Sequence, residues 1–89
     1  MIEFKFNFVA ENGMHARPAG ELVRKVSDLK SKVEISVDGK DKFVAADGIF
    51  SVMGLGIKKD DVLIFRVYGD SELSDAQELK DFMIENFSK

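Results

Sequence analysis

The sequence predicts an α+β fold in which the elements follow the order β-α-β-β-α-β-α. Two patterns carry this prediction: apolar and polar residues alternate where we expect strands, and apolar residues recur every three or four positions where we expect helices. A chain of 89 residues is long enough to bury one small core and no second one. We therefore expect a single domain over residues 1–89.

The N-terminal part of the chain predicts a strand and then a helix. Residues 2–9 alternate apolar and polar side chains, and a turn at residues 11–13 ends this strand. From Ala16 onward the apolar residues recur at helical spacing for about three turns. Pro18 lies in the first of these turns, where its missing N–H removes no hydrogen bond of the helix.

The next segment predicts a hairpin. Residues 33–37 alternate again and are followed by Asp38-Gly39, a pair typical of two-residue turns because both positions favour positive φ. We expect the return strand over residues 41–46. Its inward-facing pair is either Phe43 and Ala45 or Val44 and Ala46.

The C-terminal half predicts a short helix, a strand and a long helix. Residues 48–54 are apolar between two glycines and predict the short helix, whereas residues 62–68 are nearly all apolar, as in a central strand buried on both faces. Ser74 and Gln77 have the spacing of a capping box and predict the start of the last helix, with Asp75 in its first turn. The expected buried stripe of that helix is Leu79, Met83 and Phe87, with Phe82 beside it.

Composition excludes several classes of function. The formal net charge is −3, which argues against a nucleic-acid binder. The chain has no cysteine and one histidine, so we expect no disulfide, no metal site and no cofactor. No apolar run approaches the ~20 residues of a membrane span, and the N-terminus lacks the apolar block of a signal peptide. We expect a cytoplasmic monomer without membrane insertion.

Residues 13–19, with the sequence GMHARPA, are the one constellation that carries chemistry. A lone histidine in a small domain is most often a surface or capping residue, and that interpretation stays open. However, His15 and Arg17 both lie at the start of the predicted helix, and no acidic residue lies between His15 and Glu21. A helix N-terminus carries partial positive charge and disfavours cations, so this arrangement suits a transient anion.

A phosphoryl group is an anion that this segment could hold. The backbone N–H groups of Ala16 and Arg17 would point at it, as they do in phosphate sites at helix N-termini. The field of the helix favours neutral imidazole at His15, whose lone pair can attack phosphorus. The guanidinium of Arg17 offers a planar set of donors to the phosphoryl oxygens. These residues predict a phosphoryl acceptor.

Residues 13–19 resemble the active-site motif of the HPr family, the histidine-containing phosphocarriers of the bacterial phosphoenolpyruvate-dependent sugar phosphotransferase system. The resemblance covers essentially the whole chain, including its length, its element order, the Asp38-Gly39 turn and residues 53–57. It implies an open-faced β-sandwich, with three helices on one face of a four-stranded antiparallel sheet. It also implies a phosphocarrier with a covalent phosphohistidine rather than an enzyme.

The same resemblance implies partners and roles for named residues. Enzyme I would pass a phosphoryl group to Nδ1 of His15, and the IIA domain of a sugar permease would receive it. Arg17 would bind the phosphate, assisted by Asn12 and by the backbone N–H groups of Ala16 and Arg17. An apolar docking surface would fall on the short helix, although ordinary core packing is the alternative for its residues. These residues are Ile49, Phe50 and Met53.

The chain departs from the family at one position. Many members carry a regulatory serine at the start of the second helix, where this chain has Gly48 or Ala46, depending on the register, with Asp47 between them and Ser51 further on. A second hypothesis is therefore a paralogue that is phosphorylated on His15 but acts as a regulatory protein-binding module outside sugar transport. A third is a ligand-binding module without a covalent step, because many folds share this element order.

Overall fold

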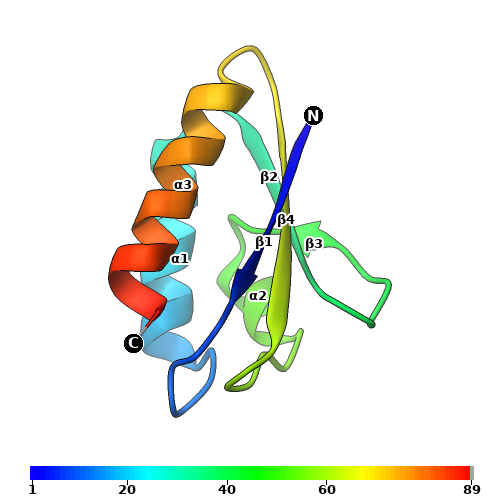
Figure 1. Cartoon of the computed structure of the whole chain (residues 1–89), viewed down its shortest axis with the longest axis vertical. Helices are drawn as coiled ribbons and strands as arrows, with labels where there is room; N and C mark the ends of the chain where they lie inside the picture. The colour runs from blue at the N-terminus through cyan, green and yellow to red at the C-terminus, as the bar shows by residue number, and fades with distance from the viewer. Residues whose placement is uncertain (89) are drawn as a thin grey trace.

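Three helices lie on one side of a four-stranded antiparallel sheet (Figure 1). The computed structural model describes residues 1–88. The predicted fold class and element order are confirmed. The strands are β1 (Ile2–Asn7), β2 (Lys32–Val37), β3 (Val44–Ala45) and β4 (Val62–Tyr68), and they lie side by side in the order β1-β4-β2-β3. The helices are α1 (Ala16–Asp28), α2 (Ile49–Met53) and α3 (Glu72–Phe87).

β4 is a central strand with only one buried face. Leu63, Phe65 and Val67 are buried beneath the helices, while the residues between them are half-buried on the open face. The prediction of a central position is confirmed, but the prediction of burial on both faces is wrong. Because all three helices cover the same side of the sheet, the opposite side of even a central strand stays in contact with solvent.

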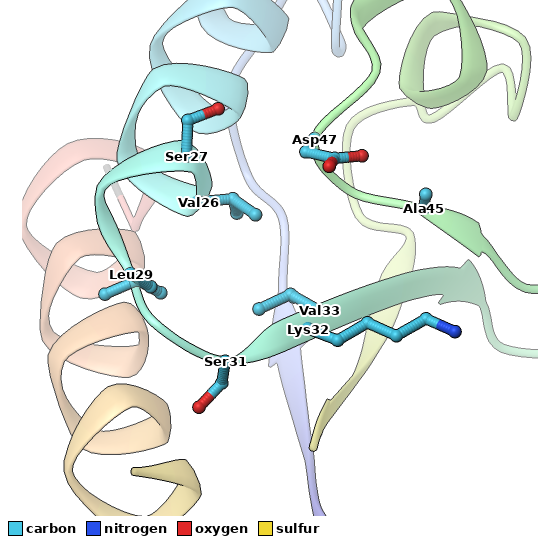
Figure 2. Close-up of a pocket in the computed structure, with 8 residues that line it drawn as sticks. All are labelled: Val26, Ser27, Leu29, Ser31, Lys32, Val33, Ala45 and Asp47. Atoms are coloured by element: carbon cyan, nitrogen blue, oxygen red, sulfur yellow. The ribbon is translucent and has the colours of Figure 1, made fainter. Parts of the chain in front are cut away.

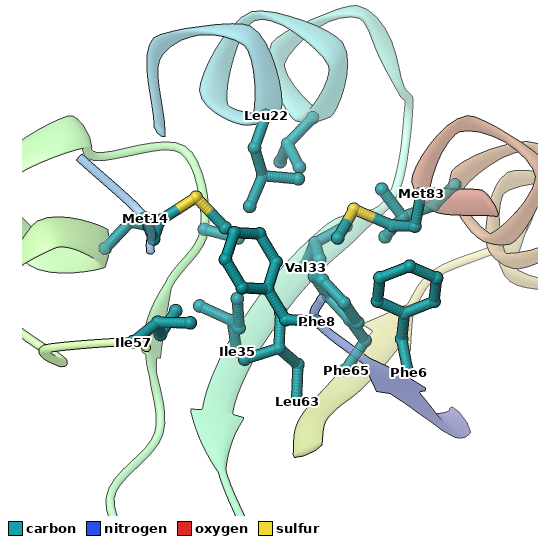
Figure 3. Close-up of a cluster of buried hydrophobic side chains, with 14 of the residues drawn as sticks. Phe6, Phe8, Met14, Leu22, Val33, Ile35, Ile57, Leu63, Phe65 and Met83 are labelled. Atoms are coloured by element: carbon teal, nitrogen blue, oxygen red, sulfur yellow. The ribbon is translucent and has the colours of Figure 1, made fainter. Parts of the chain in front are cut away.

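The core lies between that covered face and the helices. In Figure 3, Phe8, which follows β1, and Leu22 of α1 meet over the side chains of β2 and β4. Phe4 and Phe65 stack with their ring centroids 5.1 Å apart. The alternation of phenylalanines in β1 therefore produces the buried face that the sequence predicted, and α1 packs its apolar stripe on it.

The connection between β2 and β3 is longer than predicted. The pairing of β2 with β3 ends at Ile35 and Val44, so the prediction of a two-residue hairpin is wrong. Lys40 N–H does close a turn onto the Val37 carbonyl at 3.0 Å, but only Gly39 in it has positive φ. The ammonium of Lys40 then donates to the carbonyl of Leu55 at 2.8 Å, and this contact holds the loop against the end of α2.

β3 resolves the choice between the two inward-facing pairs. Ala46 is fully buried and Val44 half-buried, whereas Ala45 is exposed. Phe43 lies on the open face, where the guanidinium carbon of Arg66 is 3.8 Å from its ring centroid. The pair Val44 and Ala46 therefore faces the core.

α3 begins earlier than the capping-box prediction places it. The N-cap is Ser71, and the Ser74 hydroxyl donates to the Ser71 carbonyl at 3.2 Å from within the first turn. The Gln77 side chain donates to Asp81 at 3.0 Å instead of bonding to the backbone at the start of the helix, so the prediction of a capping box is wrong. The predicted buried stripe is confirmed. It consists of Leu79, Met83 and Phe87, with Phe82 partly buried.

Candidate functional site

His15 is the N-cap residue of α1, and its side chain is exposed. Its backbone is extended, with φ −85° and ψ −171°, and its imidazole makes no capping hydrogen bond. Its carbonyl accepts the first helical hydrogen bond, from Ala19 N–H at 3.0 Å. The imidazole therefore stands in solvent at the leading end of a helix of 13 residues, where the sequence predicted it.

The start of α1 offers free donors and no negative charge. Ala16 and Arg17 are exposed, and their N–H groups have no acceptor among residues 1–88. The first turn contains no acidic residue. Unpaired N–H groups and the positive end of the helix dipole favour an anion here. The arrangement therefore provides an acceptor nitrogen and two amide donors within one turn of chain.

Arg17 is the charged part of this arrangement. Its side chain is 87% exposed, and its Nε lies 3.6 Å from Oε1 of Glu21. A shallow hollow of about 380 Å³ runs along this side of the helix, lined by Ala16, Arg17, Gly20, Glu21 and Arg24. An exposed pair of this length is weak. A phosphoryl group with nearly two negative charges can therefore compete with Glu21 for the guanidinium.

Asn12 lies in the turn that leads to His15. It is exposed, and its side chain makes no hydrogen bond within residues 1–88. Gly13, which follows it, donates its N–H to the Ala10 carbonyl at 3.1 Å and has φ +73°. This turn brings Asn12 to the same end of α1 as His15. The structure thus gathers all four predicted phosphate-site residues at one loop–helix junction.

The three predicted docking residues differ in exposure. Phe50 is 85% exposed and Met53 is 36% exposed. Ile49 is half-buried and packs against α1 at Gly20. The contact is close: a Cβ atom added to Gly20 would lie 3.7 Å from Ile49 Cδ1. Phe50 and Met53 are thus available to a partner, while Ile49 holds α2 against the helix that carries His15.

The position of the missing regulatory serine can be located in the structure. Gly48 is the N-cap of α2, whereas Ala46 is fully buried. The start of the second helix is therefore Gly48, which has no hydroxyl group. Ser51 lies exposed within the helix.

A second hollow lies far from His15 along α1. Figure 2 shows its lining at the C-terminal end of α1, with Ser27 and Asp47 on opposite sides and Lys32 at its edge. Its volume is about 390 Å³. None of the predicted site residues lines it, so it is separate from the loop–helix junction of the candidate site.

Within residues 1–88 no group of three or more His, Asp or Glu side chains could hold a metal ion. No helix in the described part of the chain is long and apolar enough to cross a membrane.

Fold and site together define a class of small open-faced α+β proteins that present one exposed histidine where a helix begins. The family model described as PTS HPr component phosphorylation site matches residues 2–85. The chain belongs to the HPr family, the phosphocarriers of the phosphotransferase system, as the resemblance of residues 13–19 predicted.

Individual relatives agree with this assignment. The phosphocarrier protein HPr of Buchnera aphidicola is 35% identical over 83 residues, which cover 93% of each chain. The crystal structure of HPr-C-His from Thermoanaerobacter tengcongensis is 28% identical, with a TM-score of 0.87 over 100% of this chain and 98% of that one. The crystal structure of an HPr dimer from the same organism has a TM-score of 0.72 at 28% identity over 100% of both chains.

Proposed function

We propose that this protein accepts a phosphoryl group from phospho-Enzyme I on Nδ1 of His15 and donates it to sugar-specific IIA domains during phosphoenolpyruvate-dependent sugar uptake. The observation that carries the proposal is the exposed imidazole of His15 at the N-terminus of α1, beside two N–H groups without an acceptor. Membership of the phosphocarrier family supports the same role.

The chemistry follows from the groups at the helix end. The Nδ1 lone pair attacks phosphorus, so Nε2 carries the ring proton. A bond forms between Nδ1 and phosphorus while the bond from phosphorus to the donor breaks, and the bonding pair leaves with the donor. The N–H groups of Ala16 and Arg17, the guanidinium of Arg17 and the amide of Asn12 stabilise the charge on the phosphoryl oxygens. Transfer to a IIA domain repeats the exchange in the opposite sense.

Partner docking is assigned to the exposed part of α2. Phe50 and Met53 provide an apolar surface on the helix that packs against α1. They lie three positions apart on one side of the helix, and exposed apolar residues that adjoin one another are typical of interaction sites. Ile49 contributes by fixing α2. Enzyme I and the IIA domain would share this surface, because both must reach His15.

The origin of the site residues supports a monomer. Every residue assigned to phosphoryl transfer comes from one copy of the chain, so a second copy supplies nothing that the site lacks. Although one relative was crystallised as an HPr dimer, we expect sedimentation velocity to show a single species with the mass of one chain. We place this monomer in the cytoplasm, which cell fractionation tests.

Phosphoryl relay tests the proposal. Incubation with Enzyme I and labelled phosphoenolpyruvate should place an acid-labile, alkali-stable label on the protein. Addition of a IIA domain should then remove that label and transfer it to the IIA domain. A protein that stays unlabelled while a known carrier is labelled in the same mixture would contradict the proposal, and so would a label that no IIA domain accepts.

A further inference from the structure

The loop that precedes His15 is attached at both ends to one distant segment, residues 57–61. At its start, Phe8 N–H donates to the Asp61 carbonyl at 2.9 Å, and Asp60 N–H donates to the Phe8 carbonyl at 2.6 Å. At its end, Met14 N–H donates to the Ile57 carbonyl at 3.0 Å. Residues 9–13 therefore leave this segment and return to it immediately before the acceptor histidine.

The return point allows little freedom. A Cβ atom on Gly13 would lie 2.8 Å from the Ile57 carbonyl oxygen, and Gly13 has φ +73°. Only glycine meets both conditions without strain. The Met14 side chain is buried, and Figure 3 shows it beside Phe8 and Ile57. The direction in which the backbone enters His15 is therefore set by contacts with residues 57–61 and by the core.

The middle of the loop is joined to the same segment by an ion pair. Lys59 Nζ lies 2.8 Å from Oε1 of Glu11, and this is the one ion pair that joins residues 9–13 to the rest of residues 1–88. The ammonium of Lys59 lowers the pKa of Glu11 through its hydrogen bond and its charge. Glu11 directly precedes Asn12, so the ion pair restrains the residue next to a predicted phosphate ligand.

We propose that residues 57–61 are a positioning element of the phosphoryl-acceptor site, acting through the Ile57 carbonyl and the Lys59 ammonium. They hold residues 11–14 so that Asn12 and His15 meet the incoming phosphoryl group in one geometry. Orientation of reacting groups contributes strongly to transfer rates, and small displacements weaken it. The proposal rests on the proposed function, since it assigns these contacts a role in the same transfer.

Reversal of one charge tests the role of Lys59. Lys59→Glu replaces the ion pair with a second carboxylate facing that of Glu11, and the two repel each other. It should slow phosphorylation of His15 by phospho-Enzyme I about two- to fivefold, the range expected for an exposed ion pair. It should also broaden the amide NMR signals of Glu11 and Asn12. The swap variant E11K/K59E should restore both readouts at unchanged net charge, and Lys59→Arg should retain them.

Lys58→Glu is the matched control. It makes the same change of charge at a neighbouring exposed residue whose side chain has no ion pair within residues 1–88. Equal slowing by Lys58→Glu and Lys59→Glu would overturn the proposal, and so would a swap variant as slow as the single variant. If the wild type accepts no phosphoryl group, the proposed function fails. The NMR comparison still decides the positioning role, because sharp, unchanged amide signals in Lys59→Glu would refute it.

Discussion

Each residue at the start of α1 contributes a different property to the site. In the proposed function His15 supplies the nucleophilic nitrogen, Ala16 supplies a free N–H group, and Arg17 supplies a charge on an exposed side chain. The sequence predicted these residues because they are contiguous and their chemistry is local. The sequence did not predict a role for Lys59, because nothing in a single sequence links this residue to Glu11, which lies 48 positions away.

Arg17→Glu is predicted to slow phosphoryl transfer about tenfold or more, because it places a negative charge where the phosphoryl oxygens develop theirs. Stability should change by less than about 0.5 kcal/mol, since the side chain is exposed. Stopped-flow or quench measurements of phosphorylation by Enzyme I provide the rate. The control is Arg24→Glu, the same change further along α1, and equal slowing in both variants would argue against a specific role for Arg17.

At the scale of elements, contacts between neighbours in the chain were predictable and contacts between distant elements were not. Hydrophobic periodicity predicted β1, α1 and the buried stripe of α3. The capping box failed because residues with the right spacing point elsewhere: Gln77 pairs with Asp81. The two-residue hairpin failed because Asp38 lacks the positive φ that such a turn needs. Lys40 instead binds the carbonyl of Leu55, a contact that no local pattern encodes.

Asp75 joins α3 to the loop between α1 and β2. Its buried carboxylate accepts hydrogen bonds from the Ser31 hydroxyl at 2.6 Å, from Ser31 N–H at 2.8 Å and from Lys30 N–H at 3.1 Å. The Ser31 hydroxyl is the largest cause of the lowered pKa of Asp75. These bonds favour the charged form, so the group stabilises the fold above its unfolded pKa of about 3.9. This contribution is lost as the pH falls through the lower pKa of the folded state.

Asp75→Asn should therefore reduce the free energy of unfolding at pH 7 by roughly 1–3 kcal/mol. The difference from wild type should shrink as the pH falls below about 4, because the Asp75 carboxylate of the unfolded wild type then begins to bind a proton while that of the folded protein is still charged. Urea unfolding at several pH values measures both effects. Asp70→Asn, at an exposed position, is the control. A difference for Asp75→Asn that does not vary with pH would contradict this account of the carboxylate.

The exposed part of α2 gives a prediction about partners. Phe50→Asp should raise the KM for Enzyme I and for a IIA domain about tenfold or more with little change in kcat, because it disrupts docking and leaves His15 unaltered. Leu73→Asp is the matched control, since Leu73 is also highly exposed, at 75%, but belongs to α3. Equal effects of the two substitutions in steady-state transfer assays would place docking elsewhere.

At the scale of the whole molecule, the fold separates stability from function. The helices and the covered face of the sheet enclose the core, whereas His15, the proposed acceptor, stands outside it at one helix end. The sequence predicted this division because the apolar stripe of α1 and the segment GMHARPA are both visible in it. It could not predict that β4 keeps an open face, since an apolar run looks the same with one covered face or two.

The most direct measurement is the location of the phosphoryl group. After reaction with Enzyme I and phosphoenolpyruvate, ³¹P and ¹⁵N NMR of the intact protein should show one phosphoryl group bonded to Nδ1 of His15, and His15→Ala should show none. A phosphoryl group on Nε2 or on another residue, or one that remains in His15→Ala, would contradict the account.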